Sequence, residues 1–97
     1  MSAEMELLDQ LEGGELPYLM MESHVFEGDR AWALRSIEKI QQDGLITLAV
    51  GGRQVEGWRL SAWRRAPADA ATDASLEQAV LSLTDLGVRW MTYGPER

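Results

Sequence analysis

The sequence predicts an α+β domain, and three observations lead to this prediction. Residues 29–43 have the apolar spacing of an amphipathic helix, and the run stops at Gly44. Residues 45–58 follow directly and are rich in β-forming side chains, with the pair Gly51-Gly52 between their two halves. Apolar residues make up 45% of the chain and charged residues 26%, close to globular averages. The chain can therefore form a packed core that includes helices and a hairpin.

Two short helices are expected near the amino terminus. In residues 4–12, apolar side chains recur at intervals of three and four, and a glycine pair ends the run. Residues 16–22 suggest a second helix, with Pro17 in its first turn, where the missing N–H costs little. The turn that follows is expected to point Val25 and Phe26 inward.

The helix over residues 29–43 carries the clearest signals. Asp29 is a typical N-cap, and Gly44 stands where a left-handed residue ends a helix. At 100° per residue this helix has two distinct faces. The face toward the core carries Ala33, Leu34, Ile37, Ile40 and Gln41. The opposite face, which points to solvent or a partner, carries Trp32, Arg35, Lys39 and Gln42.

The hairpin has a predicted register. A two-residue turn at Gly51-Gly52 pairs Val50 with Arg53. Side chains alternate across a strand, so one face of this hairpin is expected to point inward with Ile46, Leu48, Val50 and Val55. Three further aromatic residues are expected in the core or against the sheet, with the first at the base of the hairpin: Trp58, Trp63 and Trp90.

The carboxyl-terminal third is less regular. Residues 58–65 have no clean period and receive no assignment. Residues 66–75 are small and polar, and we expect a surface loop there. The tail, residues 94–97, is expected to be frayed, and residues 1–97 are expected to form a single domain.

Two alternatives stay open for the segment between the loop and the tail. In the first, Ser75–Gln78 is a capping box that opens a helix. In the second, residues 79–83 form a strand that alternates around Val80 and Ser82, and Thr84 starts a short helix.

Charge is unevenly distributed along the chain. The formal net charge is −7, which opposes nucleic-acid binding, because such binding depends on neutralising phosphates. Residues 1–28 carry seven acids and no Lys or Arg, whereas residues 29–65 carry +3 and residues 66–97 carry −3. The middle of this acidic chain is therefore basic, and it is the part in which a nucleic-acid surface is expected.

Several functional classes lack support in the sequence. The chain has no cysteine, which excludes disulfides and thiolate chemistry, and His24 is its one histidine, expected in a turn. No metal-ligand spacing, nucleophile–base pattern or phosphate-binding loop is present, so we expect neither an enzyme nor a cofactor. The acidic start lacks the features of a signal peptide and no apolar run would span a membrane, so the expected location is the cytoplasm.

Two short motifs and the elements around them resemble winged helix-turn-helix regulators of the MarR/PadR-like kind. The first motif is Asp43-Gly44-Leu45-Ile46, which ends the long helix, and the second is Leu83-Thr84-Asp85-Leu86-Gly87. The resemblance covers residues 4–92 and implies a winged-helix fold: amino-terminal helices, a central helix, a β-hairpin and a carboxyl-terminal helix. Two departures concern the wing, since Glu77-Gln78 stands where a basic tip is usual and the stretch after the hairpin is long.

The resemblance implies that residues 29–43 are a recognition helix, which lies in the major groove of duplex DNA in members that bind DNA. The implied DNA-contacting residues are Arg35 and Lys39, with Trp32 and Gln42 beside them and Arg53 at the hairpin tip. Arg and Lys can recognise guanine edges, and Gln can recognise adenine.

Three functions remain open. The first is a DNA-binding transcriptional regulator, expected as a dimer. The second is a protein–protein interaction module in which the acidic amino-terminal third or the Trp32 face docks a partner. The third is a nucleic-acid mimic built from the acids. Arg35 and Lys39 could equally form an ordinary solvated face, and Trp32 is either sheltered or an exposed anchor.

Overall fold

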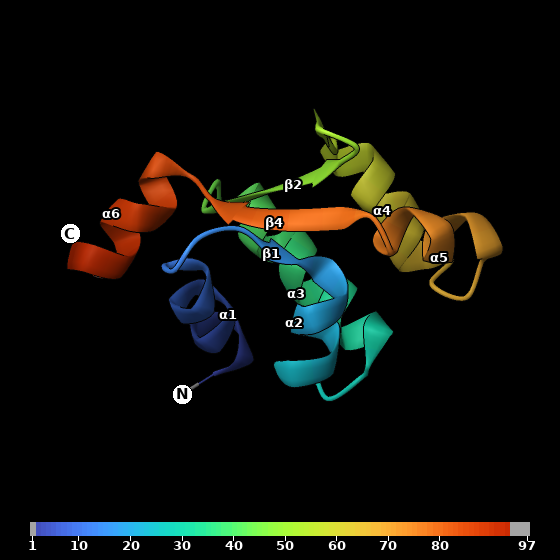
Figure 1. The fold of residues 1–97 in the computed structure, drawn as a ribbon, viewed down its shortest axis with the longest axis horizontal. Helices are drawn as coiled ribbons and strands as arrows, with labels where there is room; N and C mark the ends of the chain where they lie inside the picture. The colour runs from blue at the N-terminus through green and yellow to red at the C-terminus, as the bar shows by residue number, and fades with distance from the viewer. Residues whose placement is uncertain (1, 94–97) are drawn as a thin grey trace.

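The chain folds as an α+β structure in which helices pack on one face and at the ends of a small antiparallel sheet (Figure 1). The computed structural model describes residues 2–93. Within this range the elements, in chain order, are α1 (Ala3–Leu11), β1 (Leu16–Pro17), α2 (Tyr18–His24), α3 (Arg30–Gln42), β2 (Ile46–Val50), β3 (Arg53–Gln54), α4 (Gly57–Arg65), α5 (Ala70–Leu76), β4 (Ala79–Leu83) and α6 (Asp85–Tyr93).

The strands form one sheet in the order β1-β4-β2-β3. Strand β4 pairs with β2 along its whole length, from Ile46 opposite Leu83 to Val50 opposite Ala79. On its other edge β4 pairs with β1 at two positions only, which brings Leu16 opposite Leu81. Strands β2 and β4 are thus neighbours although β3, α4 and α5 lie between them in the sequence.

One face of the sheet forms part of the core. Ile46, Leu48 and Leu81 are buried on that face, and the helices meet them with side chains such as Tyr18 and Phe26. Figure 1 shows α1, α2 and α3 gathered on the lower side of the sheet, with α6 at one end of the molecule and α5 at the other. The opposite face of the sheet carries partly exposed, mostly small residues: Thr47, Ala49, Val80 and Ser82.

The amino-terminal helices follow the predicted order with one correction. Val25 and Phe26 are buried, as predicted. The helix expected over residues 16–22 is wrong at its start, because Leu16 and Pro17 form β1 and α2 begins at Tyr18. Proline cannot donate to a central ladder, but it is tolerated on an edge strand, and β1 is at the edge of the sheet.

Helix α3 and the turn of the hairpin match the prediction closely. Asp29 caps α3 by accepting a hydrogen bond from the Trp32 N–H at 3.0 Å, and Gly44 ends it with φ of +78°. Val50 pairs with Arg53, as predicted. The second strand is shorter than expected, because β3 ends at Gln54 and the chain soon enters α4.

Two predictions for tryptophans and the following segment need correction. Trp58 lies in the first turn of α4 with 68% of its surface exposed, so its predicted burial is wrong, whereas Trp63 is buried. The expected surface loop over residues 66–75 is also wrong, because α5 occupies most of it. Asp69 caps α5 by accepting from the Ala71 N–H, and α5 buries Leu76.

The second alternative for the following residues is confirmed. Ser75 lies inside the last turn of α5, so the capping box that would start a helix there is wrong. Residues 79–83 form β4, and Thr84 directly precedes α6. The tail expected to fray, residues 94–97, lies outside the described residues. None of the helices in residues 2–93 is long and apolar enough to cross a bilayer.

Candidate functional site

The outer face of α3 presents a short polar stripe. Arg35, Lys39 and Gln42 are all exposed on this face, and we call them the α3 stripe. Trp32 does not join them fully: it is partly buried and packs edge-on against Phe26, with ring centroids 5.1 Å apart and an interplanar angle of 87°. The structure therefore brings together three of the four outward residues predicted on this helix.

The two cations of the α3 stripe differ in their surroundings. The Lys39 Nζ lies 3.6 Å from a carboxylate oxygen of Glu4 on α1, with side-chain exposures of 68% and 38%. Such an exposed ion pair stabilises a protein by about 0–1 kcal/mol, so Lys39 can readily exchange Glu4 for another anion. Within residues 2–93, Arg35 has no acidic group within 4.0 Å, so it is the less neutralised cation of the stripe.

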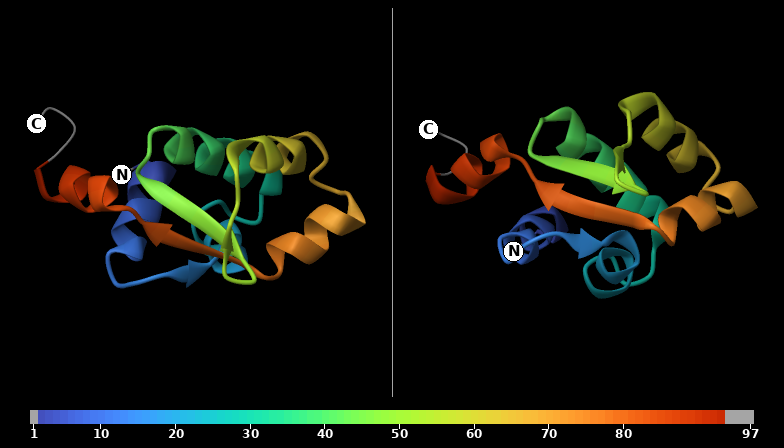
Figure 2. Two further views of the ribbon diagram at one scale, coloured as in Figure 1. Left: turned by 90° about the horizontal axis from the view of Figure 1, so that it is seen from above. Right: turned by 45° about the horizontal axis from the view of Figure 1, so that its top comes forward.

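Helix α4 flanks α3. The Glu38 carboxylate accepts hydrogen bonds from the Ser61 hydroxyl and, at 2.6 Å, from Arg64 Nε. Gln41, near the end of α3, donates from Nε2 to the Val55 carbonyl at 2.9 Å, just before α4 begins. The end of α3 therefore lies beside the start of α4, so the two helices run antiparallel. In both views of Figure 2, α3 and α4 lie on the same side of β2.

This neighbour limits how α3 can be approached. Packed helices lie about 8–10 Å apart, and the major groove of B-DNA is about 12 Å wide, so both helices cannot enter one groove. The Glu38 flank of α3 is closed by α4, and the open part of α3 is its stripe. Helix α4 could not be assigned from the sequence, because its two buried residues, Leu60 and Trp63, are too few to produce a clear period.

Helix α4 adds basic and aromatic side chains beside the α3 stripe. The pKa of the Glu38 carboxyl is lowered by the Ser61 hydrogen bond, by Arg64 and by the charge of Arg65, so Arg65 also lies near α3. Arg59 stacks over the Trp63 ring at 5.3 Å from its centroid. The basic character of the middle of the chain is therefore shared by two neighbouring helices.

Arg30 has an internal role and does not contribute to this surface. Its guanidinium donates to Glu22 at 2.7 Å, to Asp73 at 3.0 Å and to the Pro67 carbonyl at 3.4 Å. Glu22 also accepts from the buried Tyr18 hydroxyl at 2.8 Å, and burial together with this contact raises the pKa of the phenol. Arg30 thus joins α2, α3 and α5.

Arg53, the predicted phosphate contact, is exposed at the hairpin tip beside Gly52. Gly51 and Gly52 both have positive φ, of 59° and 81°, as a type I′ turn requires. The tip is thus a tight turn with one cation, and the strand after it, β3, is only two residues long.

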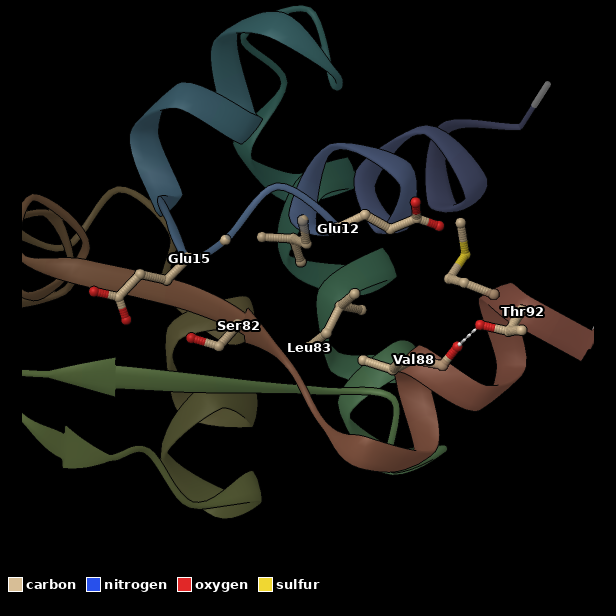
Figure 3. Close-up of a pocket in the computed structure, with 9 residues that line it drawn as sticks. Glu12, Glu15, Ser82, Leu83, Val88 and Thr92 are labelled. Atoms are coloured by element: carbon tan, nitrogen blue, oxygen red, sulfur yellow. Dashed lines mark hydrogen bonds between the residues drawn. The ribbon is translucent and has the colours of Figure 1, made fainter.

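A groove of about 570 Å³ lies on another part of the molecule, between α1, the end of β4 and α6. Its apolar lining includes Leu11, Leu83 and Val88, and Glu12 and Glu15 stand at its edge. Figure 3 shows Val88 and Thr92 on α6 across from Glu12, which directly follows α1, with Leu83 between them. We call this the α1–α6 groove.

Residues 2–93 contain no cluster of three or more His, Cys, Asp or Glu side chains that could hold a metal ion.

Comparison with known proteins adds no family assignment. No protein-family model matches the chain, and neither the curated proteins nor the solved structures include a significant match.

Proposed function

We propose that this chain is a winged-helix domain that binds duplex DNA through the α3 stripe. The element order supports this proposal: two helices and a longer third one, a glycine-turned hairpin, and a last strand and carboxyl-terminal helix that follow after the additional helices α4 and α5. The two motifs that resemble winged-helix regulators also meet in space, because the Thr84 hydroxyl donates to the Gly44 carbonyl at 2.5 Å.

The observation that carries the proposal is the exposure of Arg35, Lys39 and Gln42 on one face of a helix whose other face is core. A recognition helix needs this division, because only its outward side chains reach base edges and phosphates. Arg35 and Lys39 are suited to guanine or phosphate, and Gln42 is suited to adenine. Arg53 at the hairpin tip would add a phosphate contact.

The net negative charge of the protein opposes this binding. The informative measurements are therefore the salt dependence of binding and the effect of reversing single charges. We expect a mixed-sequence duplex to bind the full chain at low salt and to dissociate as salt rises, because released counterions drive the association. The Arg35→Glu variant should weaken binding by about tenfold. It should also reduce the slope of log K against log salt by about 0.9 for each phosphate that is no longer neutralised.

The matched control is Arg89→Glu on α6, which changes the net charge by the same amount at an exposed position outside the α3 stripe. We expect it to weaken binding by less than about twofold, since only the general repulsion increases. Equal effects of the two variants, or no salt-sensitive binding by the unmodified chain, would contradict the proposal.

A further inference from the structure

Helix α6 is partnered along only part of its surface. It follows β4 and contacts α1 and β4, and in residues 85–93 only Gly87 is fully buried. Leu86 and Val88 are each about half exposed, at 50% and 51%. Figure 1 shows α6 projecting at one end of the long axis of the molecule. Of these two, Val88 lines the α1–α6 groove, and an exposed apolar side chain at a groove is typical of an interaction surface.

The α1–α6 groove combines this apolar surface with negative charge. Its volume of about 570 Å³ lies within the usual range for ligand sites. The ionisable side chains that line it within the described residues are Glu12 and Glu15, and both are exposed. Figure 3 shows the two carboxylates pointing away from each other, Glu12 toward α6 and Glu15 beside Ser82.

The α1 side of the groove is also acidic. Residues 1–28 carry no Lys or Arg, so the side of the groove formed by α1 has no cation of its own. In a symmetric pair of chains joined at this groove, the same carboxylates would face one another, and like charges in an interface are costly. Charge complementarity therefore favours a cationic occupant.

We propose that the α1–α6 groove binds a basic amphipathic segment of a protein partner. Apolar side chains of the segment would cover Leu83 and Val88, and its Lys or Arg side chains would reach Glu12 and Glu15. This site uses α1 and α6 and shares no residue with the α3 stripe, so the two proposals are independent.

A random peptide display library, selected on the full chain, is the probe for this site. Peptides that bind the unmodified chain should be enriched in sequences that combine Lys or Arg with apolar residues. For one enriched peptide, we expect a Glu12→Gln/Glu15→Gln variant to raise Kd about fivefold at low salt, as the removal of two exposed charge pairs would. Val88→Ser should raise Kd by about fivefold, because it removes apolar surface that the peptide would cover.

Two matched controls isolate the groove. Glu27→Gln/Glu77→Gln removes the same charge at exposed positions outside it, and Leu19→Ser removes an exposed apolar side chain on α2. Each should change Kd by less than about twofold. Circular dichroism of every variant checks that the fold is retained.

Three results would overturn the proposal. The first is enrichment of peptides without basic residues, or no enrichment at all. The second is an equal loss of affinity in the groove variants and in their controls. The third is a concentration-dependent dimer in sedimentation that Val88→Ser dissociates, because the groove would then be covered by a second copy of this chain.

Discussion

Thr84 connects the end of α3 to the start of α6. Its N–H donates to the Leu45 carbonyl at 3.0 Å, and its hydroxyl donates to the Gly44 carbonyl at 2.5 Å. The same hydroxyl accepts from the Gly87 N–H at 2.9 Å, as an N-cap does. The two short sequence motifs are therefore parts of one junction, which explains in physical terms why they need a Thr and a Gly three residues apart.

Gly87 is required by a close backbone approach at this junction. A Cβ atom at this position would lie 2.1 Å from the Leu45 carbonyl oxygen. We expect Gly87→Ala to lower the free energy of unfolding by about 1–3 kcal/mol, because α6 or β2 must move to relieve the overlap. Urea denaturation measures this change.

Gly57→Ala is the control for this prediction. Gly57 also lies at the start of a helix, but a Cβ atom there would meet no other atom within 4 Å. This variant should be neutral or more stable by about 0.4–1 kcal/mol, since alanine restricts the unfolded chain. Similar losses for both variants would mean that the Leu45 contact does not explain the effect.

Among the elements, α3 and α4 are joined by hydrogen bonds to one carboxylate, Glu38. The hydrogen bond from Ser61 and the nearby Arg64 lower the pKa of Glu38 below its ordinary value of 4.5. The folded state then binds this proton less tightly than the unfolded state does. Glu38 therefore stabilises the fold fully above pH 4.5, and this contribution is lost as the pH falls through the lower, folded-state pKa.

Replacing Glu38 with Gln should reveal this dependence. At neutral pH we expect Glu38→Gln to reduce the free energy of unfolding by about 1–2 kcal/mol, as for the removal of a charged hydrogen bond. The difference from the unmodified chain should shrink in acid, measured by urea denaturation from pH 7 down to the acid limit of the fold. Glu77→Gln, at an exposed position, is the control. If the difference in free energy of unfolding between Glu38→Gln and the unmodified chain does not change with pH, the stabilising role of the Glu38 carboxylate is contradicted.

Arg30 holds α2 and α5 together across α3. Its side chain is 21% exposed, and that of Glu22 is 14% exposed, so the pair is largely shielded from solvent. We expect Arg30→Gln to lower the free energy of unfolding by about 1–3 kcal/mol, because Glu22 would lose its charged partner. Arg35→Gln, which changes the same residue type on the same helix at an exposed position, should stay within about 0.5 kcal/mol. A thermal or urea unfolding series on these two variants gives the comparison.

The elements that the sequence predicted well are those determined by local signals. Helix α3 has a cap, a periodic apolar face and a terminating glycine within its own residues, and the turn at Gly51-Gly52 is equally local. Strand β1 was missed because its two residues become a strand only through pairing with β4. Helix α5 was missed because its alanine-rich sequence, next to Pro67, resembles a loop, although Asp69 caps it.

The candidate site divides in the same way. The exposure of Arg35, Lys39 and Gln42 follows from helical periodicity, which the sequence contains. The environment of Trp32 depends on Phe26 in the preceding turn, and the closure of the Glu38 flank depends on α4. Neither contact has a local signature, so periodicity alone could not decide which outward residues remain accessible.

Across the molecule as a whole, the two proposed binding surfaces carry opposite charge. The α3 stripe contains Arg35 and Lys39, whereas the α1–α6 groove is lined by Glu12 and Glu15 and shares no residue with the stripe. The molecule is also elongated, with extents of 40, 26 and 21 Å. An anionic partner and a cationic partner would thus approach different surfaces, which is why the duplex and peptide measurements are separable.

The pairing of Val50 with Ala79 has a consequence for how this fold can vary. After β3, which pairs with β2, the chain leaves the sheet through α4 and α5 and returns to it at Ala79. The length of this part can therefore change without shifting the register of β2 against β4. Each doubling of such a closed segment costs only about 0.6 kcal/mol of chain entropy. Burial limits how far the length of this segment can change, because its residues Leu60, Trp63 and Leu76 fill part of the core. Any shorter replacement must cover the same apolar surface, and it would also uncover the flank of α3 that α4 now closes.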